Sequence, residues 1–167
     1  MRPYPLVALS DEHDASKFDC GEDSLTRYLR HEAHSAQASG EARTHIWVDG
    51  ARVVAYFTVM LHDIADRELP RSARLKGHRT IPGYLLAKLA LDQSLRGQAL
   101  GKTLLIDSLA SIVRAADAVG GRVIVVDSLE DNRVHAFYCS ADFNEIPGSY
   151  RLWMKVATAR DALGLGS

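Results

Sequence analysis

A buried strand, a loop of small residues and a long amphipathic helix follow one another between residues 84 and 119. Residues 84–91 are almost continuously apolar, which indicates a strand covered on both faces. Apolar residues then recur at helical spacing over residues 100–119, and two glycines end the pattern. A second buried strand is expected at residues 123–126. This order requires an α/β fold built around a sheet.

The rest of the chain continues the alternation of strands and helices. Further strands are expected at residues 4–9, 44–48, 53–61 and 150–156, and further helices at residues 22–37 and 131–140. Asp49-Gly50 is a hairpin signal between two of these strands. Residues 63–81 are polar and predict a long loop with one turn of helix at most. We therefore expect a single domain over residues 1–167, with a mixed sheet flanked by helices.

The composition fits a folded domain rather than a membrane protein or a disulfide scaffold. The chain has 167 residues and is 47% hydrophobic, which is enough to bury a sizeable core. Cys20 and Cys139 are far apart without C-x-x-C spacing, so neither a disulfide nor a zinc site is expected. No apolar run reaches the roughly 18 residues that span a bilayer. The sequence thus predicts a cytoplasmic protein with no membrane partner and no bound metal.

The loop at residues 92–102 has the composition of an anion-binding site. Small residues allow close backbone approach, and the first N–H groups of the following helix favour an anion such as a pyrophosphate. Arg96 and Lys102 add positive charge there. The spacing around Lys102 is not that of a P-loop. From these residues alone, an ordinary tight turn between strand and helix stays an alternative.

Two segments carry a family resemblance. Residues 96–101, Arg-Gly-Gln-Ala-Leu-Gly, resemble the [Q/R]-x-x-G-x-[G/A] acyl-CoA pyrophosphate loop of GNAT N-acetyltransferases, with Ala99 where the family prefers Gly. Residues 136–143 resemble the A-x-F-Y-x-x-x-G-F segment of that family, with Asp142 at the usual Gly position. The frequent Asn of the family is Asp131 here, and Asn132 lies one place away. The resemblance implies a GNAT fold, whose mixed, mostly antiparallel central sheet splays apart at the acetyl-CoA site.

A narrower resemblance covers almost the whole chain. The segment beginning at His13 is similar to the H-x-x-x-x-F-D-C-G-x-x-x-L-x-x-x-L opening of one GNAT subgroup, and residues 81–92 are similar to its next motif, L-x-[K/R]-L-A-[V/L]-D after Ile-Pro. That subgroup includes toxins of toxin–antitoxin pairs, which acetylate the free α-amino group of aminoacyl-tRNA. The resemblance implies an acetyl-CoA-dependent acetyltransferase, with aminoacyl-tRNA as acceptor, an antitoxin as partner and a homodimeric state.

The resemblance also assigns roles to residues. Tyr138 is the expected catalytic general acid, because a phenol of pKa about 10 can donate to a thiolate whose conjugate acid lies near 8.5. The residues expected to bind acetyl-CoA are Leu89, Ala90, Leu91, Arg96, Gly97, Gln98, Ala99, Leu100, Gly101, Lys102, Asn132 and Phe137. The N–H groups of residues 89–91 can serve only if the strand is splayed, and Ala99 fits only if its position does not need a positive φ.

Two alternatives to these roles stay open. Tyr138 can instead be a core aromatic at a helix end. Cys139 next to it can suggest an acyl-cysteine intermediate, but no His–Cys pairing is visible in the sequence. No general base is assigned, because an aminoacyl α-amino group titrates near 7.7 or below and is partly neutral at pH 7.

Charge is distributed unevenly along a chain whose formal net charge is −1. Residues 1–66 carry −5, residues 67–102 carry +6 and residues 103–167 carry −2. Part of the basic block suits a tRNA backbone, and the residues expected to bind the acceptor are Arg67, Arg71, Arg74, Lys76 and Arg79. A solvated loop is the alternative for them. Two other functions stay open: acetylation of a small amine or a protein N-terminus, and a non-catalytic module that binds acyl-CoA.

Overall fold

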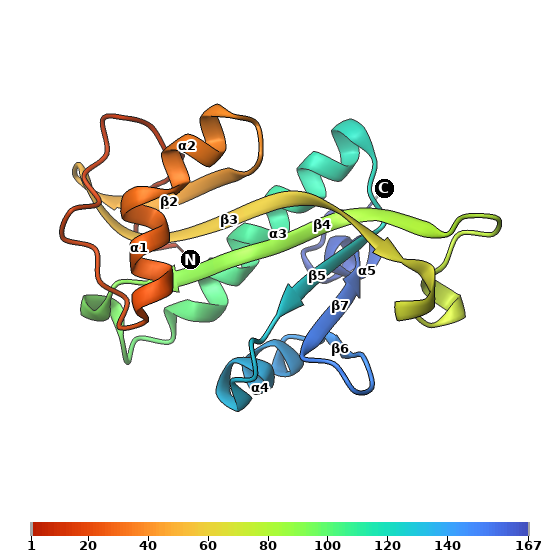
Figure 1. Cartoon of the computed structure of the whole chain (residues 1–167). Helices are drawn as coiled ribbons and strands as arrows, with labels where there is room; N and C mark the ends of the chain where they lie inside the picture. The colour runs from red at the N-terminus through yellow and green to blue at the C-terminus, as the bar shows by residue number, and fades with distance from the viewer. Residues whose placement is uncertain (1, 167) are drawn as a thin grey trace. The chain divides into compact units, whose positions relative to one another are not determined.

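Seven strands form one sheet in the order β1-β2-β3-β4-β5-β7-β6 (Figure 1). The computed structural model describes residues 2–166. Its strands are β1 (Leu6–Ala8), β2 (Arg43–Asp49), β3 (Arg52–Ala65), β4 (Thr80–Leu91), β5 (Val123–Asp127), β6 (Asn144–Glu145) and β7 (Arg151–Lys155). β4 and β5 are parallel, whereas the β1–β2, β2–β3, β5–β7 and β6–β7 pairs are antiparallel. The predicted mixed, mostly antiparallel sheet is confirmed.

The helices agree with the sequence pattern except near residue 32 and at the unpredicted helix after β7. They are α1 (Asp23–His31), α2 (Ala33–Ala38), α3 (Leu100–Val119), α4 (Asn132–Ser140) and α5 (Val156–Ala162). The expected single helix over residues 22–37 is wrong, because the backbone at Glu32 leaves helical geometry at φ −123° and ψ −31°. The side chain of Gln37 on α2 bonds to both Leu9 O and Thr44 N–H, which ties α2 to β2. No helix within residues 2–166 combines the length and apolarity needed to cross a bilayer.

Two short elements were not predicted. β6 has two residues, too few to show a periodic pattern. α5 begins at Val156, directly after β7, and buries Val156 and Ala159. The expected last strand over residues 150–156 therefore ends one residue earlier than its apolar pattern suggests.

The chain forms two compact units. Unit 1 contains residues up to 60 together with residues 87–108, and unit 2 contains residues 61–86 and residues from 109 onward. β3, β4 and α3 each contribute residues to both units. The single domain expected from the chain length stays a prediction.

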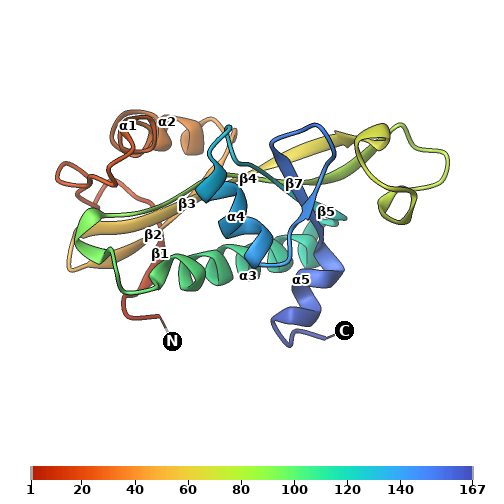
Figure 2. The ribbon, with the colours of Figure 1, turned by 90° about the horizontal axis from the view of Figure 1, so that it is seen from below.

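In unit 1, helices cover both faces of β2 and β3 (Figure 2). Ile46 and Tyr56 are paired across the two strands, and the Tyr56 hydroxyl donates to Leu25 O of α1 at 2.6 Å. Trp47 points to the opposite face, where its indole N–H donates to Asp107 of α3 at 2.8 Å. Alternation along β2 therefore directs successive side chains to the two helical layers.

Unit 2 is built on β5, whose residues Val123, Ile124, Val125 and Val126 are all buried. Parallel pairing with β4 runs from Gly83↔Val123 to Leu85↔Val125. A β-carbon at Gly83 would overlap the carbonyl oxygen of Val123, so the close approach of the two strands requires glycine. The last described pair between β4 and β5 is at Leu85, whereas β4 continues to Leu91. This is the pattern expected where two strands splay apart.

Candidate active site

The loop that joins β4 to α3 in unit 1 has the tight backbone expected of an anion-binding loop. It passes through a 3₁₀ turn (Gln93–Leu95) and through Gly97 at φ +77° before α3 begins at Leu100. Gly97, Gln98, Ala99 and Lys102 are exposed, and Leu100 and Gly101 are half-buried. The first N–H groups of α3 lack partners within the helix, so this exposed end can receive a phosphate.

Ala99 has the positive φ that its predicted role in the loop was expected to avoid. Its φ is +56°, in the left-handed region. A β-carbon there costs about 1–2 kcal/mol, which explains why the family prefers glycine. Asp142, the second departure from the family pattern, also has a positive φ, of +69°. Both departures therefore place side chains where the backbone favours glycine.

A buried carboxylate fixes the base of this loop. Asp92 is 4% exposed, and its carboxylate accepts the Asp19 N–H at 2.9 Å and both the N–H and hydroxyl of Ser94. Arg52 Nη2 lies 3.2 Å from it. Burial acts to raise the pKa of Asp92, but these hydrogen bonds and the Arg52 charge outweigh it, and the pKa is lowered. The carboxylate is therefore ionised and holds the loop at neutral pH.

Arg96 bonds to the Phe-Asp-Cys-Gly segment. Its guanidinium donates to the Cys20 carbonyl at 2.8 Å. It also lies against Gly21, whose φ is +86° and whose position leaves no space for a β-carbon beside Arg96. The Gln93 N–H donates to Asp19 O at 2.9 Å. The Phe-Asp-Cys-Gly segment thus braces the loop, and Arg96, whose side chain is exposed, forms part of that brace. The predicted contact of Arg96 with acetyl-CoA stays a prediction.

The end of β4 carries the other expected acetyl-CoA residues of unit 1. Ala90 is buried, and Leu89 and Leu91 are half-buried. The following N–H, that of Asp92, donates to Val54 O at 2.9 Å. The predicted donation from the backbone N–H groups of Leu89, Ala90 and Leu91 to a ligand stays a prediction. It is compatible with the described β4–β5 pairing, which ends at Leu85.

Tyr138 lies on α4 in unit 2. It is 6% exposed and packs edge-on against Phe137 and Phe143, with ring centroids 5.2 and 5.4 Å apart. Its hydroxyl makes no hydrogen bond within residues 2–166. Burial raises the pKa of the phenol above the ordinary value assumed from the sequence. Tyr138 is therefore protonated at neutral pH, and its role as a proton donor stays a prediction.

Asp131 is the N-cap residue of α4 and directly precedes Asn132. The Asp131 carboxylate caps the helix by accepting the N–H groups of Arg133 and Val134 at 2.9 and 3.3 Å. Asn132 is exposed as the first helical residue, and Phe137 is half-buried. Their predicted contacts with acetyl-CoA stay predictions.

Sequence reasoning missed a His–Cys pairing on α4. His135 and Cys139 lie four residues apart, and their ligand atoms lie within 4.8 Å of each other and of Glu145. The i, i+4 spacing was a signal that could have revealed this cluster. Cys20 and Cys139 are both free thiols, as expected.

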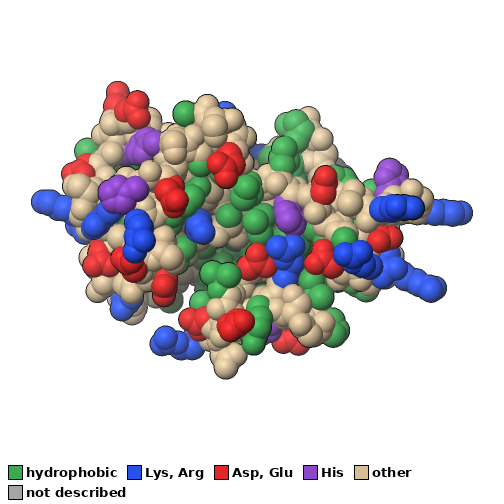
Figure 3. All heavy atoms as spheres, in the orientation of Figure 1, with side chains coloured by type: hydrophobic (Ala, Val, Ile, Leu, Met, Phe, Trp, Pro, Cys, Tyr) green, Lys and Arg blue, Asp and Glu red, His purple; other side chains and the backbone are tan. Residues whose placement is uncertain are grey.

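The basic loop between β3 and β4 presents most of its charges to solvent. Arg67, Arg71, Lys76 and Arg79 are exposed, whereas Arg74 is half-buried and donates to Leu69 O at 2.7 Å. Leu69 and Ala73 are buried and anchor the loop in the core of unit 2. Lys and Arg side chains project from this loop at one end of Figure 3. Four of the five predicted residues, Arg71, Arg74, Lys76 and Arg79, line one depression.

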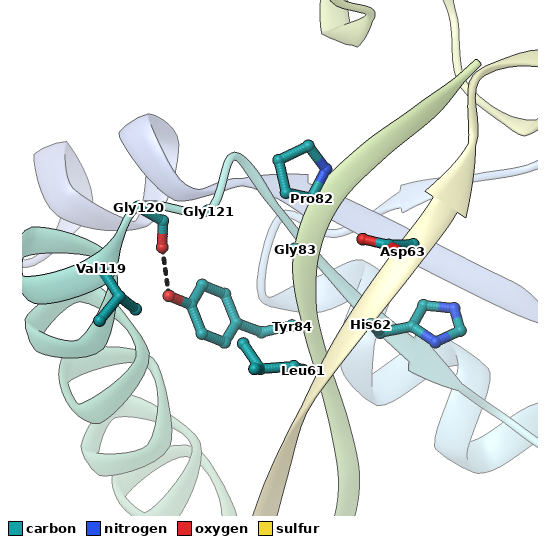
Figure 4. Close-up of a pocket in the computed structure, with 9 residues that line it drawn as sticks. All are labelled: Leu61, His62, Asp63, Pro82, Gly83, Tyr84, Val119, Gly120 and Gly121. Carbon is teal, nitrogen blue, oxygen red and sulfur yellow. Dashed lines mark hydrogen bonds between the residues drawn. The ribbon is translucent and has the colours of Figure 1, made fainter. Parts of the chain in front are cut away.

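A second depression in unit 2 holds no catalytic group (Figure 4). The Tyr84 ring crosses it and donates its hydroxyl to the Gly120 carbonyl at the end of α3. The His62 side chain points away from Tyr84 and instead accepts from Arg151 at 2.9 Å. Gly121, at φ +118°, leaves room for the Tyr84 ring. The Tyr84 hydrogen bond ties β4 to the end of α3, and none of the predicted site residues lines this depression.

The sheet order and the tight loop before α3 are those of the GNAT fold. No protein-family model matches the chain. It is 33% identical over 157 residues to the tRNA-acetylating toxin of Mycobacterium tuberculosis, covering 93% of this chain and 94% of the relative. It is 28% identical to the probable toxin TacT of Sinorhizobium fredii, covering 92% and 91%. The chain therefore belongs to the family of tRNA-acetylating GNAT toxins.

Solved structures agree with this assignment. The fold matches a KacT variant with a TM-score of 0.85 at 23% identity, covering 95% of this chain and 98% of KacT. AtaT complexed with acetyl-methionyl-tRNAfMet matches with a TM-score of 0.83 at 25% identity, covering 96% and 97%. An AtaT tyrosine-to-phenylalanine mutant bound to acetyl-CoA and the C-terminus of the antitoxin AtaR matches with a TM-score of 0.79 at 25% identity, covering 95% and 96%.

Proposed function

We propose that this protein transfers the acetyl group of acetyl-CoA to the α-amino group of aminoacyl-tRNA and acts as a toxin that blocks translation. The observation that carries the proposal is the 33% identity to a tRNA-acetylating toxin over 93% of the chain. The AtaT complexes with acetyl-methionyl-tRNAfMet and with acetyl-CoA support both substrates. The same neighbours support an antitoxin partner, and a tRNA substrate supports a cytoplasmic location.

The start of α3 receives the CoA pyrophosphate in this proposal. The exposed backbone of Gly97 to Gly101 offers N–H donors, and the helix dipole favours the negative charge. Lys102 is exposed one residue further and adds a cation. Arg96 contributes its charge while its guanidinium braces the loop at Cys20. Leu89, Ala90 and Leu91 donate to the pantetheine and the thioester oxygen, and Asn132 and Phe137 contact CoA from α4.

The reaction is a direct transfer. The neutral α-amine attacks the thioester carbonyl carbon, the new C–N bond forms, and the C–S bond breaks as the CoA thiolate leaves. Tyr138 gives its proton to that thiolate, and the amine releases its extra proton to water. Because burial raises the pKa of Tyr138, the donor stays fully protonated at neutral pH, although the transfer is more uphill than for an ordinary phenol.

The basic loop contacts the tRNA backbone in the same proposal. Arg67, Arg71, Lys76 and Arg79 are exposed, so their cations can pair with phosphates without breaking internal bonds. Recognition through phosphates and shape suits a tRNA acceptor stem. Arg74 already bonds to Leu69 O and contributes mainly by ordering the loop. A homodimer and a single domain over residues 1–167 remain predictions.

Labelled acetyl-CoA incubated with total charged tRNA tests the proposal. We expect label in the charged tRNA and none in a matched deacylated sample, because only the aminoacyl group carries the α-amine. Transfer of label to small amines or protein N-termini, with none to charged tRNA, would replace this proposal with the alternative acceptor. Acetyl-CoA binding without any transfer would favour a non-catalytic module.

A further inference from the structure

Three side chains with metal-ligating atoms meet beside the C-terminal end of α4. His135 and Cys139 lie on one face of α4, and Glu145 reaches them from β6. His135 Nε2 lies 2.8 Å from Glu145 Oε1, and Cys139 Sγ lies 3.8 Å from the same oxygen. All three ligand atoms lie within 4.8 Å of one another.

We propose that His135, Cys139 and Glu145 bind a transition-metal ion of the zinc class. A tetrahedral zinc ion with N, S and O ligands at about 2.0–2.3 Å sets its ligand atoms roughly 3.4–3.6 Å apart. The observed separations lie on both sides of that range, so shifts of about 1 Å suffice. Imidazole and thiolate favour Zn²⁺ or Co²⁺ over Mg²⁺ or Ca²⁺. Three protein ligands leave a fourth position for water.

A hydrogen bond between His135 Nδ1 and the Ser128 hydroxyl orients the imidazole ring. The Ser128 hydroxyl donates its single proton to Tyr150 O at 2.7 Å. At 3.2 Å from His135 Nδ1 it can therefore only accept, so Nδ1 carries a proton. Ser128 is 1% exposed, which fixes its position. The Nε2 atom faces Glu145 Oε1 at 2.8 Å and donates to it, so a metal ion would take the place of this proton while Nδ1 keeps its bond to Ser128, as in sites where a second hydrogen bond orients the ligand.

The charges of the cluster suit a divalent cation. Zinc binding forms a Zn–S bond and releases the thiol proton and the Nε2 proton to solvent. One thiolate and one carboxylate then neutralise the two positive charges.

Such an ion links α4 to β6. The metal closes a segment of eleven residues, from His135 to Glu145, which includes the proposed general acid Tyr138. This inference revises the sequence-based expectation of no metal. Its test measures metal binding and does not depend on the acetyl-transfer proposal.

Titration of the full-length protein with Co²⁺ is the direct experiment, because a bound thiolate gives a near-ultraviolet charge-transfer band. We expect the band to saturate at one equivalent per chain and to disappear when Zn²⁺ is added. Cys139→Ser should abolish the band. His135→Ala and Ser128→Ala should each weaken binding by at least about tenfold.

Matched variants keep the result interpretable. Cys20→Ala removes the other thiol, and His34→Ala removes a histidine outside the cluster, so both should keep the band and the affinity. Circular dichroism verifies the folding of each variant, and His135→Gln replaces His135→Ala if the latter fails to fold. A wild-type protein without the band, or equal affinity in wild type, Cys139→Ser and the folded His135 variant, would overturn the proposal.

Discussion

The carboxylate of Asp92 accepts the backbone N–H of Asp19 at 2.9 Å, although 73 residues separate the two in sequence. This bond joins the Phe-Asp-Cys-Gly turn to the base of the proposed pyrophosphate loop. The reciprocal bond from Gln93 N–H to Asp19 O and the Arg96 bond to Cys20 O reinforce it. The turn therefore acts as a positioning element for acetyl-CoA binding.

Replacing Asp92 should loosen this connection. Asp92→Ala leaves the Asp19 and Ser94 donors without their acceptor, so we expect a loss of about 2–3 kcal/mol in the free energy of unfolding. We also expect weaker acetyl-CoA binding by isothermal titration. Asp23→Ala, at an exposed position on α1, is the control and should change stability by less than about 0.5 kcal/mol. Equal effects of the two variants would contradict the role of Asp92.

The same carboxylate predicts a pH dependence. The pKa of Asp92 is lower in the folded protein than in the unfolded chain, so its stabilisation is complete above about pH 4. It is lost as the pH falls through the folded-state value. The difference in unfolding free energy between wild type and Asp92→Asn should therefore be constant from pH 5 to 8 and shrink below pH 4 in urea titrations. A difference that grows on acidification would reverse the assigned sign.

Tyr138→Phe removes the proposed proton donor while keeping the ring between Phe137 and Phe143. We expect the acetyl-transfer rate to fall by roughly 10²–10⁴-fold, the usual range for acid–base groups. The melting temperature should change little, because the hydroxyl makes no hydrogen bond within residues 2–166. Tyr150→Phe, at a residue 50% exposed, is the control. A Tyr138→Phe rate within twofold of wild type would remove Tyr138 from the mechanism.

Ala99→Gly should stabilise the protein. Glycine relieves the left-handed conformation at φ +56°, and its greater freedom in the unfolded chain offsets part of the gain. The net increase in unfolding free energy should be about 0.5–1 kcal/mol. Ala115→Gly, inside α3, should instead destabilise by about 1 kcal/mol. Loss of stability in both variants would show that Ala99 is not strained.

The basic loop predicts the salt dependence of tRNA binding. Each substitution of Arg67, Arg71, Lys76 or Arg79 by Gln should reduce the salt slope of tRNA affinity by about one. Filter binding at several salt concentrations measures this slope. Arg114→Gln, on the exposed part of α3, is the matched control. Unchanged slopes in all four loop variants would mean that the loop is only solvated.

Local patterns were sufficient for much of the fold. The continuous apolar run that became β4 and the helical spacing of α3 each predicted an element correctly, because those signals lie within one segment. The break at Glu32 was not visible, since it depends on the bonds of Gln37 to Leu9 and Thr44. Thr44 belongs to β2 and Leu9 follows β1, so neither partner leaves a periodic trace in residues 22–37.

In the candidate site, too, features set within one segment were predicted, whereas contacts with distant residues were not. The tight loop at residues 96–101 was predicted from its small residues and its family resemblance. The partner of Arg96 was not, because the Cys20 carbonyl is 76 residues away and carries no side-chain signal. The raised pKa of Tyr138 likewise follows from its burial near Phe137 and Phe143, which only packing reveals.

The most direct test of the central claim compares two acceptors that carry the same aminoacyl group, one on tRNA and one on a simple ester. We predict a kcat/KM for the tRNA that is higher by orders of magnitude at 50 mM salt. Four phosphate contacts imply a loss of about 10²-fold between 50 and 200 mM salt, whereas the ester rate should hardly change. Equal kcat/KM values for the two acceptors at both salt concentrations would contradict the account.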